Sequence, residues 1–290
     1  MPTRIGTAET GGTFFTQALA LKSVLDADGA LAPVEVRETP GASVGNAELL
    51  DAGAIDFGFM AANWVARATG GKPPFARPIA LRTIAPMNVG PLFFIVRADS
   101  ALASVDDLAA RRVVFGPQKS GMAEHAGVIL GALGIAGAVP VHLDFAAGAA
   151  AVESGAADAQ LQCPIPNRVM TELCRRTAVR VLPYGPGRLE RVLAAVPFYR
   201  RCVMPAGAIP GLALDLPQIG VLNVLVAHAR LGDDRAAAMA RAIVAHAAAL
   251  ERLNPLFGGL GRLCATFGAD GVPGLHSGAA RAYGAPGPAL

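Results

Sequence analysis

Charged residues are sparse in this chain, and their scarcity excludes partners that need concentrated charge. Only 16% of the 290 residues are Asp, Glu, Lys or Arg, and the net charge of +3 comes from interspersed signs. The one aromatic and basic cluster, at residues 198–201, is too short to form a nucleic-acid-binding stripe. We therefore expect no nucleic-acid partner.

Cysteine and histidine are few and scattered. The sequence has no CxxC, HxxxH or HExxH spacing, which argues against a metal site, and the cysteines are expected to be small buried hydrophobes. No nucleophile stands beside a base, so we expect neither an enzyme nor a bound cofactor. The residues are Cys163, Cys174, Cys202, Cys264, His125, His142, His228, His246 and His276.

Long apolar runs are also missing. Residues 92–96 and 219–227 form strand-length runs, far short of the roughly 18 residues that a membrane span requires. We expect no membrane insertion. The first residues lack a basic stretch followed by an apolar one, so the expectation is either a cytoplasmic protein or a mature form whose export signal has been removed.

What the chain does have is a repeated local pattern. Residues 4–15, 34–46 and 113–122 each contain a β-branched run, a Gly/Ser-rich turn and a helical pattern. In an open parallel sheet such turns lie at the carboxyl ends of the strands, where helix N-termini direct N–H groups at a ligand. The pattern predicts a binding cleft for a small molecule, with an anion favoured.

A second pattern links the two halves of the chain. Residues 47–58 are echoed by residues 149–160: in each, a short helix carries an acid two residues before a glycine, and the next strand opens at an Asp. Two lobes of similar topology are the simplest cause, and 290 residues exceed one ordinary domain. A chance match in an Ala/Gly-rich chain is the alternative.

Strands alternate with helices along the sequence, which predicts an α/β class with mainly parallel sheets. We expect the chain to cross between lobes near residues 86–99 and 213–227. The first lobe then contains residues 1–90 and 218–290, and the second contains residues 91–217. Expected strands are 3–7, 34–39, 55–60, 91–97, 112–116, 140–144, 158–162, 179–183 and 219–227; expected helices are 13–26, 44–52, 63–69, 105–109, 121–133, 148–154, 166–175, 234–252 and 257–267.

Several different short motifs follow one another along nearly the whole chain. They are Ile5-Gly6-Thr7 with Gly11-Gly12-Thr13-Phe14-Phe15, Gly41-Ala42-Ser43-Val44-Gly45-Asn46 with Gly53 and Asp56, Arg97-Ala98-Asp99-Ser100 with Asp106-Asp107-Leu108, Gly116-Pro117 with Ser120-Gly121, and His276-Ser277-Gly278-Ala279 with Tyr283. Each motif alone is weak, but several at compatible spacing are far more specific. Together they resemble the TAXI family of TRAP transporter solute-binding proteins.

The resemblance implies a two-lobe type II periplasmic-binding-protein fold with a ligand cleft between the lobes. It also implies a periplasmic receptor that delivers a glutamate-like amino acid or a dicarboxylate to a TRAP membrane permease. Four residues depart from the family pattern: Ala110 replaces a glycine, Lys119 a small residue, Met122 a threonine and Ile209 an aromatic. Because the last three are candidates for the ligand's surroundings, the resemblance does not fix the substrate.

The candidate ligand-binding residues lie in the Gly/Ser-rich turns and just after the strands. We expect backbone N–H groups of the turns to matter more than any single side chain. The candidates are Gly11, Gly12, Thr13, Phe14, Ser43, Asn46, Asn63, Lys119, Ser120, Gly121, Met122, Gln162, Pro164 and Arg168.

Local structure offers these side chains alternative roles. Gly11 to Thr13 can form a tight turn and an N-cap, and Ser43 and Asn46 fit the N-cap and third position of one helix. Ser120 fits the N-cap of another helix. The amides of Asn63 and Gln162 either contact a ligand or cap the helices that follow.

Charged candidates suggest an anionic or zwitterionic ligand. Lys119 at a cleft mouth would attract an anion, and Glu9 would pair with an ammonium group; the alternative for Lys119 is a solvated side chain. The guanidinium of Arg168 can grip a carboxylate or lie in solvent, and the same holds for the Tyr199, Arg200 and Arg201 side chains.

The sequence thus predicts a two-lobe solute receptor that captures a small organic acid or amino acid by hinge closure. Two alternatives stay open. One is an intracellular ligand sensor or accessory protein with the same fold. The other is an enzyme of the pyrimidine-precursor type, against which the absence of a His/Cys cluster counts.

Overall fold

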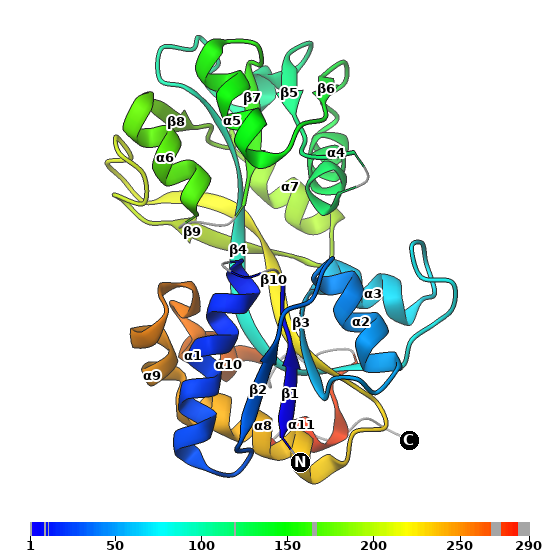
Figure 1. The fold of residues 1–290 in the computed structure, drawn as a ribbon. Helices are drawn as coiled ribbons and strands as arrows, with labels where there is room; N and C mark the ends of the chain where they lie inside the picture. The colour runs from blue at the N-terminus through cyan, green and yellow to red at the C-terminus, as the bar shows by residue number, and fades with distance from the viewer. Residues whose placement is uncertain are drawn as a thin grey trace. The chain divides into compact units, whose positions relative to one another are not determined.

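The computed structural model describes residues 2–8, 10, 12–118, 120–163, 167–267 and 274–283. The chain forms two compact units (Figure 1). Unit 1 comprises Met1–Asn88 and Leu222–Leu290, and unit 2 comprises Val89–Val221. Both divisions fall inside long strands, β4 (Leu81–Arg97) and β10 (Leu216–His228), whereas the sequence placed them after residues 90 and 217.

The parallel strands of unit 1 alternate with helices, as the sequence pattern predicts. β1 (Thr3–Gly6) pairs in parallel with β2 (Val34–Arg37) and with β3 (Phe57–Ala61). β10 runs antiparallel to β3, so that Asn223 is paired with Ala61. The helices that follow the three parallel strands are α1 (Thr13–Asp28), α2 (Ser43–Asp51) and α3 (Ala62–Thr69).

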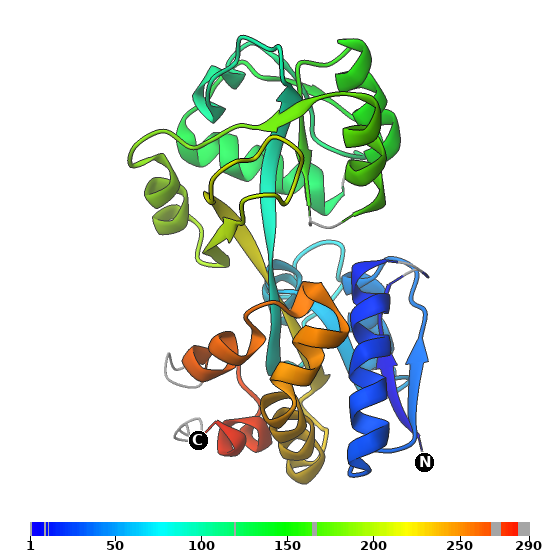
Figure 2. The same cartoon turned by 90° about the vertical axis from the view of Figure 1, so that its left-hand side faces the viewer.

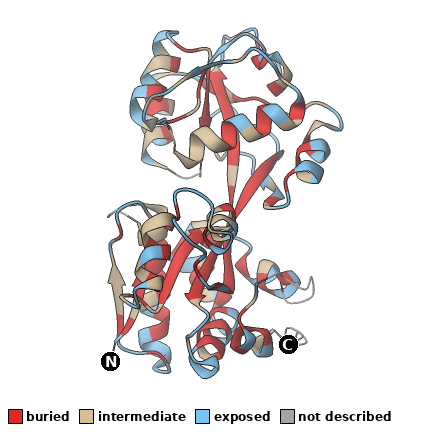
Figure 3. Cartoon of the chain, turned by 90° about the vertical axis from the view of Figure 1, so that its right-hand side faces the viewer, coloured by how far each residue is buried: buried red, intermediate tan, exposed pale blue. Residues whose placement is uncertain are grey.

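The core of unit 1 lies between this sheet and the helices packed on it. Figure 2 shows α1 alongside β1 and β2, and Figure 3 shows the central strands of the unit as mostly buried. Leu21 of α1, Phe57 of β3, Leu225 of β10 and Ile243 are all fully buried in one cluster. Each such side chain contributes roughly 1.5–3 kcal/mol by leaving water.

The C-terminal helices of unit 1 differ from the sequence prediction. One helix was expected over 234–252, but the backbone leaves the helical conformation at His246 (φ −105°, ψ 14°). The periodicity hid this break, because Ala247 and Leu250 continue the apolar pattern into the same core. The elements are α8 (Asp233–Ala245), α9 (Ala247–Leu253), the 3₁₀ turn η2 (Pro255–Phe257), α10 (Leu260–Phe267) and the unpredicted α11 (Ser277–Ala282).

Unit 2 repeats the parallel pattern. β5 (Arg112–Val114) pairs in parallel with β6 (Val139–Val141) and β7 (Ala159–Gln162), and β7 runs antiparallel to β4. β8 (Val179–Val181) also runs antiparallel to β4. The helices are the 3₁₀ turn η1 (Val105–Leu108), α4 (Gly121–Leu133), α5 (Phe145–Ser154), α6 (Arg168–Arg176) and α7 (Arg188–Ala195).

Two elements of unit 2 and the length of β4 were not predicted. β9 (Tyr199–Met204) pairs with residues 216–221 of β10, and the aromatic and basic cluster forms its start. Its polar, largely exposed face hides the strand signal. α7 begins after Gly187, which offers no side-chain cap, and β4 starts at Leu81 rather than residue 91.

An arginine and an aspartate clamp the amino-terminal edge of the unit 1 sheet. The Arg4 backbone N–H donates to Asp56 Oδ2 (2.8 Å), and its guanidinium donates to both oxygens of that carboxylate (3.2 Å each). Arg4 also donates to the carbonyl of Gly53 (3.1 Å). This Arg4–Asp56 clamp joins the start of β1 to the turn that precedes β3.

The same contacts recur in unit 2, atom by atom. Arg112 donates to Asp158 through its backbone N–H (2.8 Å) and its guanidinium (3.3 and 3.0 Å), and to the carbonyl of Gly155 (2.9 Å). Gly53 and Gly155 both have positive φ, +71° and +77°, a region that favours glycine. The glycine and the aspartate of each clamp lie within the echoed segments, and the matching contacts support two units of similar topology.

Candidate functional site

Three helix N-termini lie at the carboxyl edge of the parallel strands of unit 1. α2 begins at Ser43, and the Ser43 hydroxyl oxygen accepts a hydrogen bond from the backbone N–H of Ala61, where β3 ends (3.1 Å). α1 begins at Thr13 after the N-cap Gly12, and the ring of Phe14 stacks on Phe59 of β3 with centroids 5.6 Å apart. These contacts fix two of the predicted turns against β3.

The capping interpretation of Ser43 and Asn46 was wrong. The N-cap of α2 is Ala42, and the fully buried Asn46 donates through Nδ2 to the carbonyls of Thr7 (2.7 Å) and Phe59 (2.9 Å). A Cβ at Gly6 would lie 2.3 Å from Asn46 Oδ1, so this contact requires glycine in β1. Asn46 therefore holds β1 to β3, and its ligand contact stays a prediction.

Asn63 is the most informative side chain of unit 1. It stands at the second position of α3 and is only 3% exposed. Neither its Nδ2 nor its Oδ1 has a hydrogen-bond partner, and it does not cap α3, whose N-cap is Ala61. A buried amide without partners costs about 1–3 kcal/mol, which a bound ligand would recover.

Other buried amides in unit 1 were missed from the sequence. Gln17 of α1 and Asn223 of β10 both donate to Asn88 Oδ1, at 3.3 and 3.2 Å, and the Gln17 oxygen has no partner. Asn223 interrupts the apolar run that we interpreted as a strand. An amide inside such a run was the available signal, because a buried amide requires a polar partner.

In unit 2, α4 begins in the third Gly/Ser-rich turn. The Ser120 hydroxyl oxygen accepts from the backbone N–H of Ala123 (3.2 Å), which confirms the predicted N-cap. Gly121 and Met122 form the half-buried first turn. Gly116 has φ +96°, and a Cβ there would lie 2.9 Å from the Met122 Cβ, so the turn itself requires this glycine.

Gln162 is the counterpart of Asn63 in unit 2. It ends β7, is fully buried, and neither of its amide atoms has a partner. It does not cap α6, because Asn167 does so by accepting from the backbone N–H of Met170 (2.8 Å). In the described part of the chain, Asn63 and Gln162 are the two side-chain amides with both atoms buried and unpartnered.

Tyr184, which the sequence did not single out, also has a buried, unpartnered hydroxyl. Burial raises its pKa, and the neighbouring Tyr199 and Cys202 add to the shift. Tyr199 is engaged elsewhere, since its hydroxyl lies 2.9 Å from His125 Nδ1. Burial lowers the pKa of His125 to about 4, so this pair is neutral at pH 7.

The predicted arginines are not directed into these buried positions. Arg168 has an 89% exposed side chain and pairs with Glu172 one turn along α6. Arg200 donates to the carbonyls of Pro197 and Tyr199, and Arg201 pairs with Glu190. Three predicted ligand contacts, Gly11, Lys119 and Pro164, lie outside the described residues, as does Glu9.

The described residues give these positions a neutral, dipolar character. No described Asp, Glu, Lys or Arg is buried, and no described group of three His, Cys, Asp or Glu side chains could hold a metal. The four cysteines are free, and burial raises the pKa of the Cys163, Cys202 and Cys264 thiols to about 12. None of the described helices has the length and apolar character for a membrane crossing.

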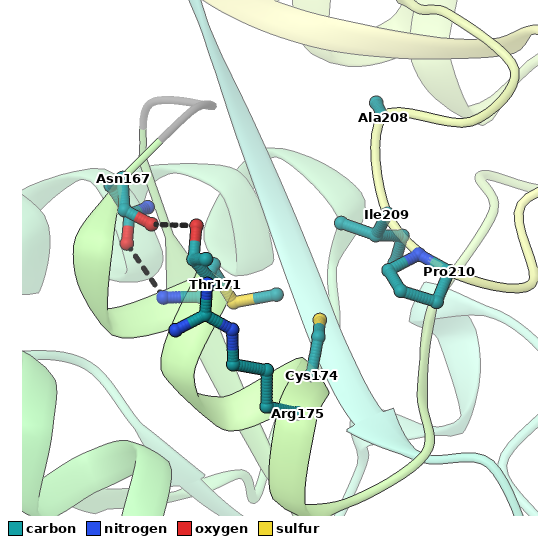
Figure 4. A pocket seen from close by; sticks show the side chains of 8 residues that line it. Asn167, Thr171, Cys174, Arg175, Ala208, Ile209 and Pro210 are labelled. Atoms are coloured by element: carbon teal, nitrogen blue, oxygen red, sulfur yellow. Dashed lines mark hydrogen bonds between the residues drawn. The ribbon is translucent and has the colours of Figure 1, made fainter.

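A pocket of about 310 Å³ lies elsewhere in unit 2, between α6 and residues 208–210. In Figure 4, Asn167, Thr171 and Arg175 follow one side of α6, and Ala208, Ile209 and Pro210 lie across from them. Met170 and Ile209 are also core residues, so the wall is largely apolar. Ser120 and Gln162 are not among its described lining residues.

Solved structures place this architecture among the periplasmic binding proteins. The periplasmic aliphatic sulphonate binding protein SsuA from Escherichia coli matches 94% of this chain and 84% of its own, with 17% identity and a TM-score of 0.55. A TctC solute binding protein from Polaromonas matches 86% and 85%, with 16% identity and a TM-score of 0.58. The BenM effector binding domain, solved with its effector benzoate, matches 89% and 93%, with 13% identity and a TM-score of 0.53.

These similarities confirm the predicted fold class, an α/β periplasmic-binding-protein fold. In structure the chain is similar to solute-binding proteins of transport systems. A model of the NMT1-like family matches residues 5–287. This protein therefore belongs to the NMT1-like family.

Proposed function

We propose that this chain is the solute-binding protein of a TRAP-type transport system of the TAXI kind, and that it captures a small organic acid or amino acid in the periplasm for delivery to a membrane permease. The observation that carries the proposal is the pair of buried, unpartnered amides, Asn63 and Gln162. Asn63 follows β3 and Gln162 ends β7, so each lies at the carboxyl edge of the parallel strands of its unit, the edge at which helices begin.

The chemistry of these groups favours an anionic or zwitterionic solute. An amide both donates and accepts, and helix N-termini donate N–H groups and carry a partial positive charge. A cationic group would find no buried carboxylate among the described residues. The TRAP and TAXI assignment rests on the motif resemblance, and capture by hinge closure is part of the same proposal.

A thermal-shift screen of the full chain tests the ligand class. Its arms are amino acids, dicarboxylates, sulfonates and aromatic carboxylates, because a ligand that binds only the native state raises the unfolding temperature by mass action. We expect a hit among the carboxylates. If no arm raises the unfolding temperature, the proposal is wrong.

Apolar variants of the amides then locate the site. Asn63→Leu and Gln162→Leu remove groups that have no partner in the chain, so the free protein should keep its stability while affinity for the hit falls about tenfold or more. Thr171→Ala, in the separate α6 pocket, is the matched control with unchanged affinity. Unchanged affinity in both Leu variants would remove these amides from the site.

A ligand sensor is the second candidate, because the effector binding domain of BenM shares the fold. Fractionation of source cells separates the two, since a transport receptor is recovered from the periplasm and a sensor from the cytoplasm.

The enzyme alternative predicts that product forms when the ligand found in the screen is incubated with stoichiometric protein. Recovery of unchanged ligand is the result expected of a receptor.

A further inference from the structure

A pocket of about 350 Å³ lies in unit 1 at the amino-terminal edge of the parallel strands. It is bounded by the Arg4–Asp56 clamp, the end of α2 and the turn that leads from β10 into α8. Asn63 and the N-termini of α1, α2 and α3 belong to the carboxyl edge of the same sheet. The pocket is therefore separate from the groups assigned to the solute.

Cationic groups outnumber anionic groups in the lining of this pocket. Three guanidiniums, those of Arg4, Arg230 and Arg235, line it together with one carboxylate, that of Asp56. Arg4 and Arg235 both contact Asp56 Oδ1, at 3.2 and 3.3 Å, and so share a single negative charge. The lining is left with an excess of positive charge.

Arg230 contributes most of this excess. Its guanidinium donates to the backbone carbonyls of Leu50 (2.8 Å) and Asp51 (2.7 Å) at the end of α2, and it makes no ion pair within the described residues. A guanidinium has five N–H donors. One end of this group is thus fixed by the helix terminus, and donors remain for a ligand.

The imidazole of His228 also lines the pocket. Burial lowers the pKa of His228, and the charge of Arg230 lowers it further, with Arg77 and Arg82 acting in the same direction. Asp51, 3.8 Å away, opposes them. His228 is neutral at pH 7, and its Nδ1 accepts the Arg230 backbone N–H (3.2 Å), which leaves the ring proton on Nε2.

The start of α8 adds backbone donors at the same place. Gly232 lines the pocket and is the N-cap of this 13-residue helix, and it has no side chain to accept from the first N–H groups. The acids of the first turn are engaged with α11: Asp233 accepts from the Ser277 hydroxyl (2.6 Å), and Arg281 lies 3.4 Å from Asp234. A ligand at Gly232 would meet the partial positive charge of the helix end.

Unit 2 supplies an internal comparison. A pocket of about 210 Å³ borders its own clamp residue, Asp158, and is lined by two guanidiniums, Arg97 and Arg111, and two carboxylates, Asp99 and Asp158. Arg97 pairs with Asp99 at 2.5 Å. The lining of this unit 2 pocket is therefore balanced in charge, whereas the lining of the unit 1 pocket is not.

We propose that the unit 1 pocket formed by Arg230, Arg235 and the α8 N-terminus is a second binding site, which takes a small divalent oxyanion such as a phosphate or sulfate group. The volume is sufficient for a tetrahedral oxyanion attached to a small organic body. Guanidinium groups bind such oxyanions through paired N–H donors.

Calorimetric titration of the full chain with inorganic phosphate and with sulfate, at constant ionic strength set by chloride, tests this site. We expect saturable binding, an approximately tenfold or greater loss of affinity in Arg230→Gln, and a similar loss in Arg235→Gln. Arg235→Gln leaves Asp56 bound by Arg4, so it still tests the site if Arg230→Gln does not fold. Arg111→Gln in the balanced pocket is the matched control and should bind as the wild type does.

Three results would overturn the proposal. One is the absence of saturable heat with either anion. Another is wild-type affinity in both Arg230→Gln and Arg235→Gln. The third is loss of binding in Asn63→Leu, which would move the anion to the carboxyl edge of the sheet. Failure of the solute screen leaves this test intact, because the two sites are probed by different ligands and different variants.

Discussion

The two units share the arginine–aspartate clamp but surround it differently. In unit 1, Asp56 is held by both Arg4 and Arg235 and has a 12% exposed side chain; in unit 2, Asp158 is held by Arg112 and is 30% exposed. The geometry of the echo is therefore kept while its electrostatic setting changes. The additional arginine comes from α8, which belongs to unit 1 and follows β10 in the chain.

A second difference concerns the amide that fills the space between helix and strand in each echo. In unit 1 the amide is Asn46 on α2, and it lies against Gly58 of β3. In unit 2 the amide is Gln160 on β7, and a Cβ at Gly148 of α5 would lie 2.4 Å from its Nε2. Helix and strand have exchanged large and small residues, so the echo keeps an amide between helix and strand, while its position and its hydrogen-bond partners differ.

The largest expected effect tests this exchange. Asn46→Leu should lower the free energy of unfolding by about 3 kcal/mol, because the carbonyls of Thr7 and Phe59 both lose a buried donor. Gln160→Met should cost about 1 kcal/mol, because one carbonyl, that of Phe145, loses its donor at 3.1 Å. Urea unfolding measures both, and equal costs would contradict the comparison.

Breaking the clamp should also cost more stability in unit 1 than in unit 2, by a smaller difference. Asp56→Asn is expected to cost about 2 kcal/mol, since two guanidiniums lose their charged partner, and Asp158→Asn about 1 kcal/mol, since its ion pair is more exposed to solvent. Chemical denaturation at pH 7 measures both losses. A larger loss in Asp158→Asn would show that Arg235 adds nothing.

Low pH should reduce the difference in unfolding free energy between Asp56→Asn and the wild type. Burial raises the pKa of Asp56, but hydrogen bonds from Arg4 and the charge of Arg235 outweigh it, and the pKa lies below the usual 3.8. A lowered folded-state pKa stabilises the protein fully above the unfolded value, and this contribution is lost as pH falls through the folded one. The difference in unfolding free energy should therefore shrink below about pH 4, and a difference that grows there would contradict the assignment.

Helix capping provides a smaller test. Ser120→Ala should lower stability by about 1 kcal/mol, because α4 loses the acceptor for the Ala123 N–H. Ser120→Asp retains an acceptor at the N-cap and is the control, with stability near that of the wild type. Thermal unfolding without ligand measures both, and equal losses would assign the effect to the turn rather than to the cap.

The smallest expected effect is a gain in stability. Ala110 has φ +57°, and the TAXI resemblance places glycine at this position. Ala110→Gly should raise the free energy of unfolding by about 0.5–1 kcal/mol, because relief of left-handed strain exceeds the entropy cost of glycine. Ala109→Gly, where φ is −57°, is the control and should destabilise. A loss of stability in Ala110→Gly would contradict this account.

Elements with a strong local signal could be predicted from the sequence. β1, α1 and α4 lie within a few residues of their expected bounds, because a β-branched run, a turn and an apolar helical face specify them locally. β9 and α7 lack such signals. Their conformation depends on pairing with β10 and on packing against neighbours that are distant in sequence.

The places of the candidate residues relative to the strands could be predicted, but their hydrogen bonding could not, and their contact with a ligand stays a prediction. Polar residues after strands identified Asn63 and Gln162, yet the same reasoning gave Asn46 equal weight, although its amide is used inside unit 1. Whether a buried amide already has partners depends on carbonyls that are distant in sequence. Tyr184 was missed for the same reason, because the burial of its hydroxyl and its lack of a partner depend on the folded chain around it.

The raised thiol pKa values have a kinetic consequence for the redox environment of this protein. With their pKa raised by burial, the thiols of Cys163, Cys202 and Cys264 are far less ionised at pH 7 than an exposed thiol, and the thiolate is the species that attacks a disulfide. Exchange with an oxidising catalyst is correspondingly slow. The folded chain therefore slows disulfide exchange at these three cysteines by disfavouring the thiolate, although Cys163 and Cys202 are partly exposed.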